Sequence, residues 1–287
     1  MIAVKDRPTE LSLLLQSLRN QTYKNFDIYI VDDCSGTPLN NYHFLMCLIN
    51  KMIEEGNFIY IERNAFNLGV SKNRQKLVDL ALNGDAELLC RVDDDVILEP
   101  DYLQKLLIVI NKGYDLASGT TPFIGQPMFK RESKFIGNVG NRVVLDNEGN
   151  FLFNGDDFGI NYNDEVILPL HHFRSCALYR REIHDKVSYD SNLTKHGFRE
   201  EEILSFKMII NGFKLGCNTQ AIAWHLNTPS GGERFPDSND LIKINEQVLK
   251  DFTKKLYKEH GDFISDYNKR LGIKEEPIVL KETNLIL

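Results

Sequence analysis

The sequence predicts an α/β fold in which helices flank a mostly parallel sheet. Apolar, strand-like runs recur about every 30 residues through the first 120 residues, and a segment with helical periodicity separates each run from the next. Strands joined by helices in this way form right-handed crossovers and parallel pairs. Hydrophobic residues make up 42% of the 287 residues, which is enough for a substantial core.

The first half alternates strand and helix in a regular order. The expected strands are Ile2–Val4, 26–31, 58–61, 87–92 and 114–118. The helices expected between them open at Thr9, over 38–54, over 69–82 and at Pro100. The first is typical, because Leu11, Leu14, Leu15 and Leu18 recur on one face after Thr9.

The second half is less regular. Residues 121–172 mix Gly, Asn and Asp with short alternating runs, which favours antiparallel hairpins. We expect strands over 173–179, 213–217 and 221–225, a helix over 198–211, and a Lys/Glu-rich helical tail over 240–270. The chain is therefore divided into a main domain, 1–232, and a helical extension, 233–287, with a boundary inside the main domain near residue 119.

The charge balance restricts the kinds of ligand that the protein can hold. With 34 Lys and Arg against 41 Asp and Glu, the net charge is −7, which argues against a general nucleic-acid binder. A polyanionic ligand must then be held locally, by a metal or by a few basic groups. The five cysteines are scattered and odd in number, and the sequence shows neither a secretory signal nor an apolar run of about 18 residues. These features favour a cytoplasmic protein. The basic tail leaves peripheral membrane contact open.

Three polar loops follow the predicted parallel strands, at residues 5–8, 32–36 and 93–95. Ligands in such sheets bind beyond the carboxyl ends of the strands, so these loops predict one site. In the last loop, alternation places Asp93 and Asp95 on one side, where both can reach a Mg²⁺ or Mn²⁺ ion. A solvated acidic turn is the alternative, and the preceding strand and the convergent loops favour the metal.

Four further groups are candidates, each with a plain structural alternative. His225 ends a strand-like run and could be a third metal ligand or a packed histidine. Glu200 and Glu201 open a helix, either as favourable charges at its N-terminus or as a general base. Asp32 and Asp33 could recognise a nucleoside or form an Asx-turn. Arg74 could meet phosphate or pair with an aspartate. The glycine-rich loop after His225, 228–234, could act as a lid.

In this order, these segments resemble the inverting family 2 glycosyltransferases with the GT-A fold. The resemblance covers residues 2 to about 226 and rests on VKDRPTEL…SLRNQTYKNFDIYIVDDCS, RNAFNLGVSKNRQ, RVDDDVILEPDYL and FREEEILSFKMIINGFKLG…AIAWH. It implies a Rossmann-like nucleotide-sugar-binding half, 1–119, an acceptor and catalytic half, 120–232, and transfer of a sugar from a nucleotide donor such as a UDP-sugar to a glycan or glycolipid hydroxyl.

Carried over position by position, the resemblance assigns roles to individual residues. Asp93, Asp95 and His225 would hold Mn²⁺ or Mg²⁺, and Glu201 would be the catalytic base. The three consecutive glutamates leave Glu200 and Glu202 open as alternatives, because a Glu replaces the family's usual Asp. The positions implied for nucleotide-sugar binding are Asp6, Arg7, Asp32, Asp33, Asn67, Arg74, Asp93 and Asp94.

Two other classes compete with this interpretation. A sugar-1-phosphate nucleotidyltransferase needs a glycine-rich, Arg-bearing loop after its first strand, and KDRPTE contains no glycine. A non-catalytic sugar-nucleotide or glycan-binding protein is the other, and intact DDD, EEE and His225 argue against it. The oligomeric state is not readable from the sequence.

Overall fold

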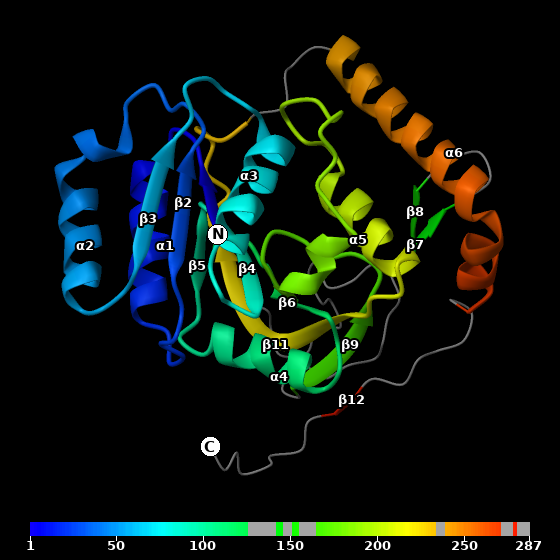
Figure 1. Cartoon of the computed structure of the whole chain (residues 1–287), viewed down its shortest axis with the longest axis horizontal. Helices are drawn as coiled ribbons and strands as arrows, with labels where there is room; N and C mark the ends of the chain where they lie inside the picture. Colours follow the sequence, from blue (N-terminus) through cyan, green and yellow to red (C-terminus); the bar gives the residue numbers. More distant parts are fainter. Residues whose placement is uncertain (126–141, 146–150, 155–164, 234–238, 271–277, 280–287) are drawn as a thin grey trace.

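The computed structural model describes residues 1–125, 142–145, 151–154, 165–233, 239–270 and 278–279. One large mixed sheet runs through the molecule in the order β12-β9-β11-β6-β10-β4-β1-β2-β3, and β5 pairs separately with β11 (Figure 1). The expected α/β fold is confirmed.

The N-terminal half of the sheet is parallel. Its strands are β1 (Ile2–Val4), β2 (Ile28–Asp32), β3 (Ile59–Arg63) and β4 (Leu88–Asp93). β1 lies between β2 and β4 and is parallel to both, with Ile2 opposite Ile30 and Val92. All of these strands therefore end at one edge, which is where the sequence predicted the polar loops to meet.

The second half adds antiparallel pairs. β10 (Ala177–Arg180) lies between β4 and β6 (Leu116–Thr120) and is antiparallel to both. β9 (Val166–Leu170) pairs with β11 and with β12 (Ile278–Val279). The hairpin expected within 121–172 is seen as β7 (Arg142–Leu145) and β8 (Phe151–Asn154). The rest of the expectation for 126–164 lies outside the described residues.

One expectation about strands was wrong, and one short strand was not expected. The segments 213–217 and 221–225 form one strand, β11 (Leu215–His225), because the pairing with β6 continues across an irregularity between Cys217 and Ile222. The short strand β5 (Val96–Leu98), directly after the three aspartates, was not anticipated, and it pairs antiparallel with the end of β11. This pairing brings His225 opposite Val96 and therefore beside Asp95.

The helices cover the sheet much as the periodicity predicted. They are α1 (Pro8–Arg19), α2 (His43–Glu54) after a 3₁₀ turn (Leu39–Asn41), α3 (Val70–Leu82), α4 (Tyr102–Asn111), α5 (Glu200–Ile210) after a 3₁₀ turn (Arg181–Asp185), and α6 (Asn239–Arg270). Leu11, Leu14, Leu15 and Leu18 of α1 are buried in the core, as their spacing predicted. Among the described residues, no helix combines the length and apolar character that crossing a membrane requires.

Candidate active site

A cavity of about 390 Å³ lies at the edge where β1, β2 and β4 end. The loop after β1, the start of α3, the Asp93–Asp95 segment and the end of β11 all contribute side chains to it. Its polar lining residues are Lys5, Arg7, Asp33, Asn73, Arg74, Asp93, Asp94, Asp95, His196, His225 and Glu233. Seven residues predicted from distant segments therefore line one cavity, namely Arg7, Asp33, Arg74, Asp93, Asp94, Asp95 and His225. The other predicted site residues are not among its lining residues, namely Asp6, Asp32, Asn67, Glu200 and Glu201.

Arg7 holds the last two aspartates of the DDD segment from the start of α1. Its Nη1 atom lies 2.7 Å from Asp94 Oδ1 and 3.0 Å from Asp95 Oδ2, and all three side chains are buried. Because charged groups are costly to bury unless they are paired, these contacts keep the acidic segment folded against the sheet.

The first aspartate belongs to a different ion-pair cluster. Arg74 of α3 donates from Nη2 to Asp93 Oδ1 at 2.8 Å and also pairs through Nη1 with Glu200 at the start of α5. Arg91 of β4 contacts Glu200 at 3.0 Å and Glu201 at 2.5 Å, and its guanidinium lies over the ring of Phe173. Arg91 thus connects the strand that carries the aspartates with the helix that carries the candidate bases.

Sequence reasoning did not single out Arg91. Its position two residues before Asp93 was a possible signal, because alternation along β4 places the two side chains on one face. The clue to a role is its burial: Arg91 is only 2% exposed, and an arginine at that depth needs carboxylate partners.

Burial affects the three aspartates differently. Burial opposes ionisation of Asp93, but the guanidinium groups of Arg74 and Arg91 outweigh it and lower the pKa of this carboxyl. Burial raises the pKa of Asp94 to about 7, although Arg7 opposes the shift. The pKa of Asp95 is also raised by burial, against the effect of the neighbouring His225. A group that neutralises these carboxylates would therefore be favoured in the cavity.

The metal ligands implied by the sequence can be compared with this geometry. Asp95 Oδ1 lies 3.6 Å from His225 Nε2, and Asp93 lines the same cavity. Carboxylate oxygens and an imidazole nitrogen are a donor set that suits Mn²⁺. Among the described residues, no group of three or more His, Cys, Asp or Glu side chains is close enough together to hold an ion as it stands. The residue types fit a cation, and their side chains would have to converge on it.

The ring of His225 carries a specific constraint. The backbone N–H of Asn227 donates to His225 Nδ1 at 2.8 Å, so the neutral ring carries its proton on Nε2, the atom that faces Asp95. Coordination through Nε2 requires that proton to leave, and Nδ1 must then be the protonated nitrogen. The loop that starts at Leu226 would therefore have to exchange this hydrogen bond when a metal binds.

Asp32 and Asp33, expected at the nucleoside, both have partners within the fold. Asp32 accepts from the Ser35 N–H at 2.8 Å, which is the Asx-turn alternative, and pairs with Arg63 at 2.6 Å. Asp33 accepts from the N–H groups of Leu68 and Gly69, at 2.8 and 2.9 Å, and so fixes the loop that leads into α3. Asp33 lines the cavity, but its hydrogen bonds already organise the cavity wall.

The glycine-rich loop after β11 is closed onto the loop after β1. The Gly232 N–H donates to the Lys5 carbonyl at 2.8 Å, and Glu233 contacts both Lys5, at 3.4 Å, and Asn67. Gly231 has a φ of 71°, and a Cβ there would lie 2.5 Å from Arg7 Cγ. Only glycine allows this close approach.

Asp6, the remaining predicted residue, is exposed beside the cavity. Its Oδ1 accepts from the Gly36 N–H at 2.6 Å, and its own N–H donates to Ser35 Oγ at 2.8 Å. These contacts join the first two loops of the sheet edge. Asp6 does not line the cavity formed by the described residues.

Solved structures of other proteins resemble this architecture. TarS of S. aureus, solved in complex with UDP-GlcNAc, has a TM-score of 0.55 and 14% identity and covers 95% of this chain and 75% of its own. GalNAc-T7, solved with UDP, GalNAc and Mn²⁺, has a TM-score of 0.63 and 15% identity, covering 87% and 46%. At such identity the likeness shows the fold, and the expected GT-A fold is confirmed.

Sequence comparison gives the family. An uncharacterized glycosyltransferase of Haemophilus influenzae is 31% identical over 110 residues, which are 37% of this chain and 32% of that protein. The present chain thus matches about a third of the length of that relative. The family model described as glycosyl transferase family 2 matches residues 1–188, well over half of the chain. The chain therefore belongs to glycosyl transferase family 2.

Proposed function

We propose that the protein transfers a sugar from a nucleoside-diphosphate donor to a hydroxyl acceptor, with inversion at the anomeric carbon and with the help of a divalent cation. The observation that carries this proposal is the cavity at the carboxyl ends of the parallel strands, where Asp93, Asp95 and His225 lie beside Arg7 and Arg74. Ligands of open α/β sheets bind at this edge. Family membership supplies the class of reaction.

A UDP-sugar is the donor that we propose, because the structural neighbours TarS and GalNAc-T7 were solved with UDP or UDP-GlcNAc. Asp93, Asp95 and His225 would hold Mn²⁺ or Mg²⁺. The cation would neutralise the diphosphate as it leaves. Lys5 and Arg7 line the same cavity and would contribute further positive charge.

Glu201 is the catalytic base that the geometry favours. Its side chain is 21% exposed, whereas that of Glu200 is 5% exposed and paired with both Arg74 and Arg91. A base must reach the hydroxyl proton of the acceptor, and the more accessible carboxylate meets that requirement. Arg91 and the Ser175 N–H hold one oxygen of Glu201 at 2.5 and 2.8 Å, which fixes its direction.

The acceptor that we propose is a glycan or glycolipid. Peripheral contact with a membrane would follow from a lipid-linked acceptor, and the lysines of α6 could provide it, namely Lys250, Lys254, Lys255 and Lys258. A membrane anionic in charge would attract them. Membrane contact is thus proposed only for a lipid-linked acceptor, and the proposed sugar transfer does not depend on it.

The test is a product assay with a panel of UDP-sugars, with and without Mn²⁺. We expect release of free UDP that requires the cation and is lost in Asp95→Asn. Asp101→Asn is the matched control, because Asp101 is a half-exposed aspartate of the α4 terminus that pairs with Lys105. Pyrophosphate as product would indicate a nucleotidyltransferase. Metal-dependent binding of donors without any turnover would indicate a non-catalytic binding protein.

A further inference from the structure

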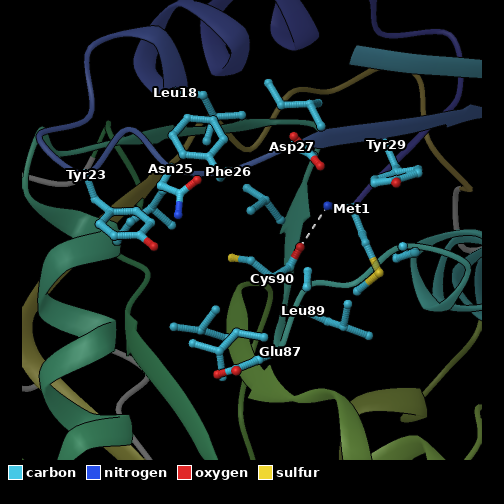
Figure 2. A pocket seen from close by; sticks show the side chains of 18 of the residues that line it. Met1, Leu18, Tyr23, Asn25, Phe26, Asp27, Tyr29, Glu87, Leu89 and Cys90 are labelled. Atoms are coloured by element: carbon cyan, nitrogen blue, oxygen red, sulfur yellow. Dashed lines mark hydrogen bonds between the residues drawn. The ribbon is translucent and has the colours of Figure 1, made fainter. Parts of the chain in front are cut away.

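Strand β4 connects two cavities of the molecule. Its residues 88–90 line a cavity of about 530 Å³ (Figure 2), and its last residue, Asp93, lines the candidate active site. β10 runs antiparallel beside β4, with Ala177, its first residue, opposite Arg91. The chain that leads into β10 therefore arrives beside the active-site end of β4.

The register of this pair brings Ser175 opposite Asp93. In an antiparallel pair, the residue two before Ala177 comes opposite the residue two after Arg91, and opposed side chains lie on the same face. The two side chains are in contact. Burial opposes the ionisation of Asp93, and a hydrogen bond with the Ser175 hydroxyl joins the positive charges described above in lowering the pKa of this carboxyl. The hydroxyl is the donor, because an ionised carboxylate can only accept.

The backbone of Ser175 contacts a second carboxylate. Its N–H donates to Glu201 Oε1 at 2.8 Å, while its hydroxyl meets Asp93. One residue thus bonds both the aspartate at the end of β4 and the glutamate in the first turn of α5. Among the described residues, those that line the candidate active site do not include Ser175. Any role of Ser175 in the reaction is therefore exerted through these two carboxylates.

The backbone conformation of Ser175 is strained. Its φ is 56°, in the region that favours glycine. The N–H of Cys176 donates to the Arg174 carbonyl at 2.7 Å, so these three residues form a γ-turn, and γ-turns with a positive φ are rare and strained. Strain of this kind persists where the surroundings hold the residue firmly, and it is concentrated at functional sites. Glycine would adopt the turn without strain but could not supply the hydroxyl.

Arg91 contacts the same two carboxylates in a different way. Its Nη2 atom lies 3.6 Å from Asp93 Oδ1 and 2.5 Å from Glu201 Oε1. A single charged atom draws the two side chains together without fixing their directions. The bonds from Ser175 add direction, because they come from a rigid turn. Both bonds to Glu201 go to Oε1, which leaves Oε2 for the proton of an acceptor.

We propose that Ser175 is a positioning residue that holds the side chains of Asp93 and Glu201 in a fixed relation to each other. The hydroxyl acts on Asp93, and the rigid turn acts on Glu201 through the N–H. This inference rests on the proposed function, in which Asp93 is a ligand of the cation and Glu201 is the base. Because the two effects come from different parts of the residue, two variants separate them.

Ser175→Ala removes the hydroxyl and keeps a side chain that holds the turn. We expect Mn²⁺ binding, measured by titration calorimetry without donor, to weaken about tenfold, because a partner that orients a metal ligand is lost. At saturating Mn²⁺ and UDP-sugar, kcat should stay within about threefold of the wild-type value. Ser12→Ala is the matched control, since the Ser12 hydroxyl donates to the Pro8 carbonyl within α1 at 2.8 Å. Neither Mn²⁺ binding nor kcat should change in the control.

Ser175→Gly also removes the hydroxyl, and it lets the turn open. We expect this variant to melt about 2–4 °C above Ser175→Ala, because glycine relieves the strained φ. Its kcat at saturating Mn²⁺ and UDP-sugar should nevertheless be about tenfold lower than that of Ser175→Ala, since the N–H no longer fixes Glu201. A residue with only a structural role would give the opposite order, with the more stable variant at least as active.

The outcomes distinguish this proposal from the proposed function. Wild-type Mn²⁺ affinity in both Ser175 variants would overturn the role of the hydroxyl, and equal kcat values in the two variants would overturn the role of the turn. A wild-type protein that binds Mn²⁺ but has no turnover would refute the proposed function, and the calorimetry would still decide whether the hydroxyl positions Asp93. A wild-type protein that binds no Mn²⁺ would refute both.

Discussion

Replacing Glu201 by glutamine should abolish most turnover and leave the fold and the donor site in place. One oxygen of Glu201 accepts from the Ser175 N–H at 2.8 Å and from Arg91 Nη2 at 2.5 Å. The amide oxygen of glutamine, on a side chain of the same length, can accept both bonds. The second oxygen becomes an NH₂ group, which cannot take a proton from an acceptor hydroxyl.

The size of the effect follows from the role of the carboxylate. Loss of a positioned general base lowers turnover by about 10²–10⁴-fold, which is roughly 3–5 kcal/mol of barrier. The change in stability should be smaller, about 1–2 kcal/mol, because a charge-assisted hydrogen bond becomes a neutral one. Glu200→Gln is the matched comparison. It removes a negative charge that Arg74 and Arg91 share, so we expect a donor affinity that is unchanged or tighter, with less than about a tenfold loss of turnover.

The assay is steady-state release of nucleoside diphosphate in the presence of acceptor, with donor binding measured by calorimetry for the same proteins. Unaltered turnover in Glu201→Gln, together with loss of turnover in Glu200→Gln, would move the base by one residue and refute the argument from exposure. Loss of donor binding in Glu201→Gln would instead assign that residue to the donor site.

Three further changes have definite expectations. A Cβ on Gly119 would lie 2.1 Å from the Ala221 carbonyl oxygen, so Gly119→Ala should lower the unfolding free energy by about 1–3 kcal/mol or more in thermal denaturation, whereas Gly125→Ala, with nothing within 4 Å, should change it little. Burial lowers the pKa of His184 below its usual 6.5, so the folded state binds fewer protons than the unfolded state. The contribution of this residue to stability should be complete above about pH 6.5 and fall below it, by at most about 1.4 kcal/mol per pH unit. His184→Gln should flatten this slope in urea titrations. Glu233→Gln removes a carboxylate that contacts Lys5, which lines the cavity, and Asn67, and calorimetry should show donor binding tightened about two- to tenfold. An unchanged or weaker affinity would indicate that the closed loop does not compete with the donor.

Much of the fold could be predicted because its signals are local and periodic. Four leucines on one face of the first helix and the apolar runs that end at Val4 and Val92 define which faces are buried. The meeting of Asp93 with His225, more than 100 residues apart, came from a topological rule: parallel strands present their carboxyl ends at one edge. That rule predicts a shared edge, and the cavity that the two residues line agrees with it.

What the sequence could not provide depends on partners that lie far away along the chain. Asp32 carries the same acidic signal whether it meets a nucleoside or Arg63, and only the fold decides between them. The strand β5 is three residues long, too short for a periodic signal, and exists because β11 pairs with it. In the sequence, Arg91 is a single charged residue within an apolar run. Its role becomes visible only in the fold, where it contacts carboxylates of α5.

The charges at the site give a physical reason for the cation. Five carboxylates, those of Asp93, Asp94, Asp95, Glu200 and Glu201, face three guanidinium groups, and each guanidinium already contacts at least two of them. With all five ionised, the cluster keeps two negative charges more than it can pair. A diphosphate adds further negative charge to the same cavity, and releasing an arginine to meet it would leave a buried carboxylate unpaired, at a cost of about 3–5 kcal/mol. A divalent cation held by Asp93 and Asp95 would neutralise the excess negative charge, so that no arginine would have to leave its carboxylates to meet the diphosphate. The distribution of the carboxylates therefore supports the metal dependence that we propose, and this dependence should be strongest for donors that carry the full diphosphate.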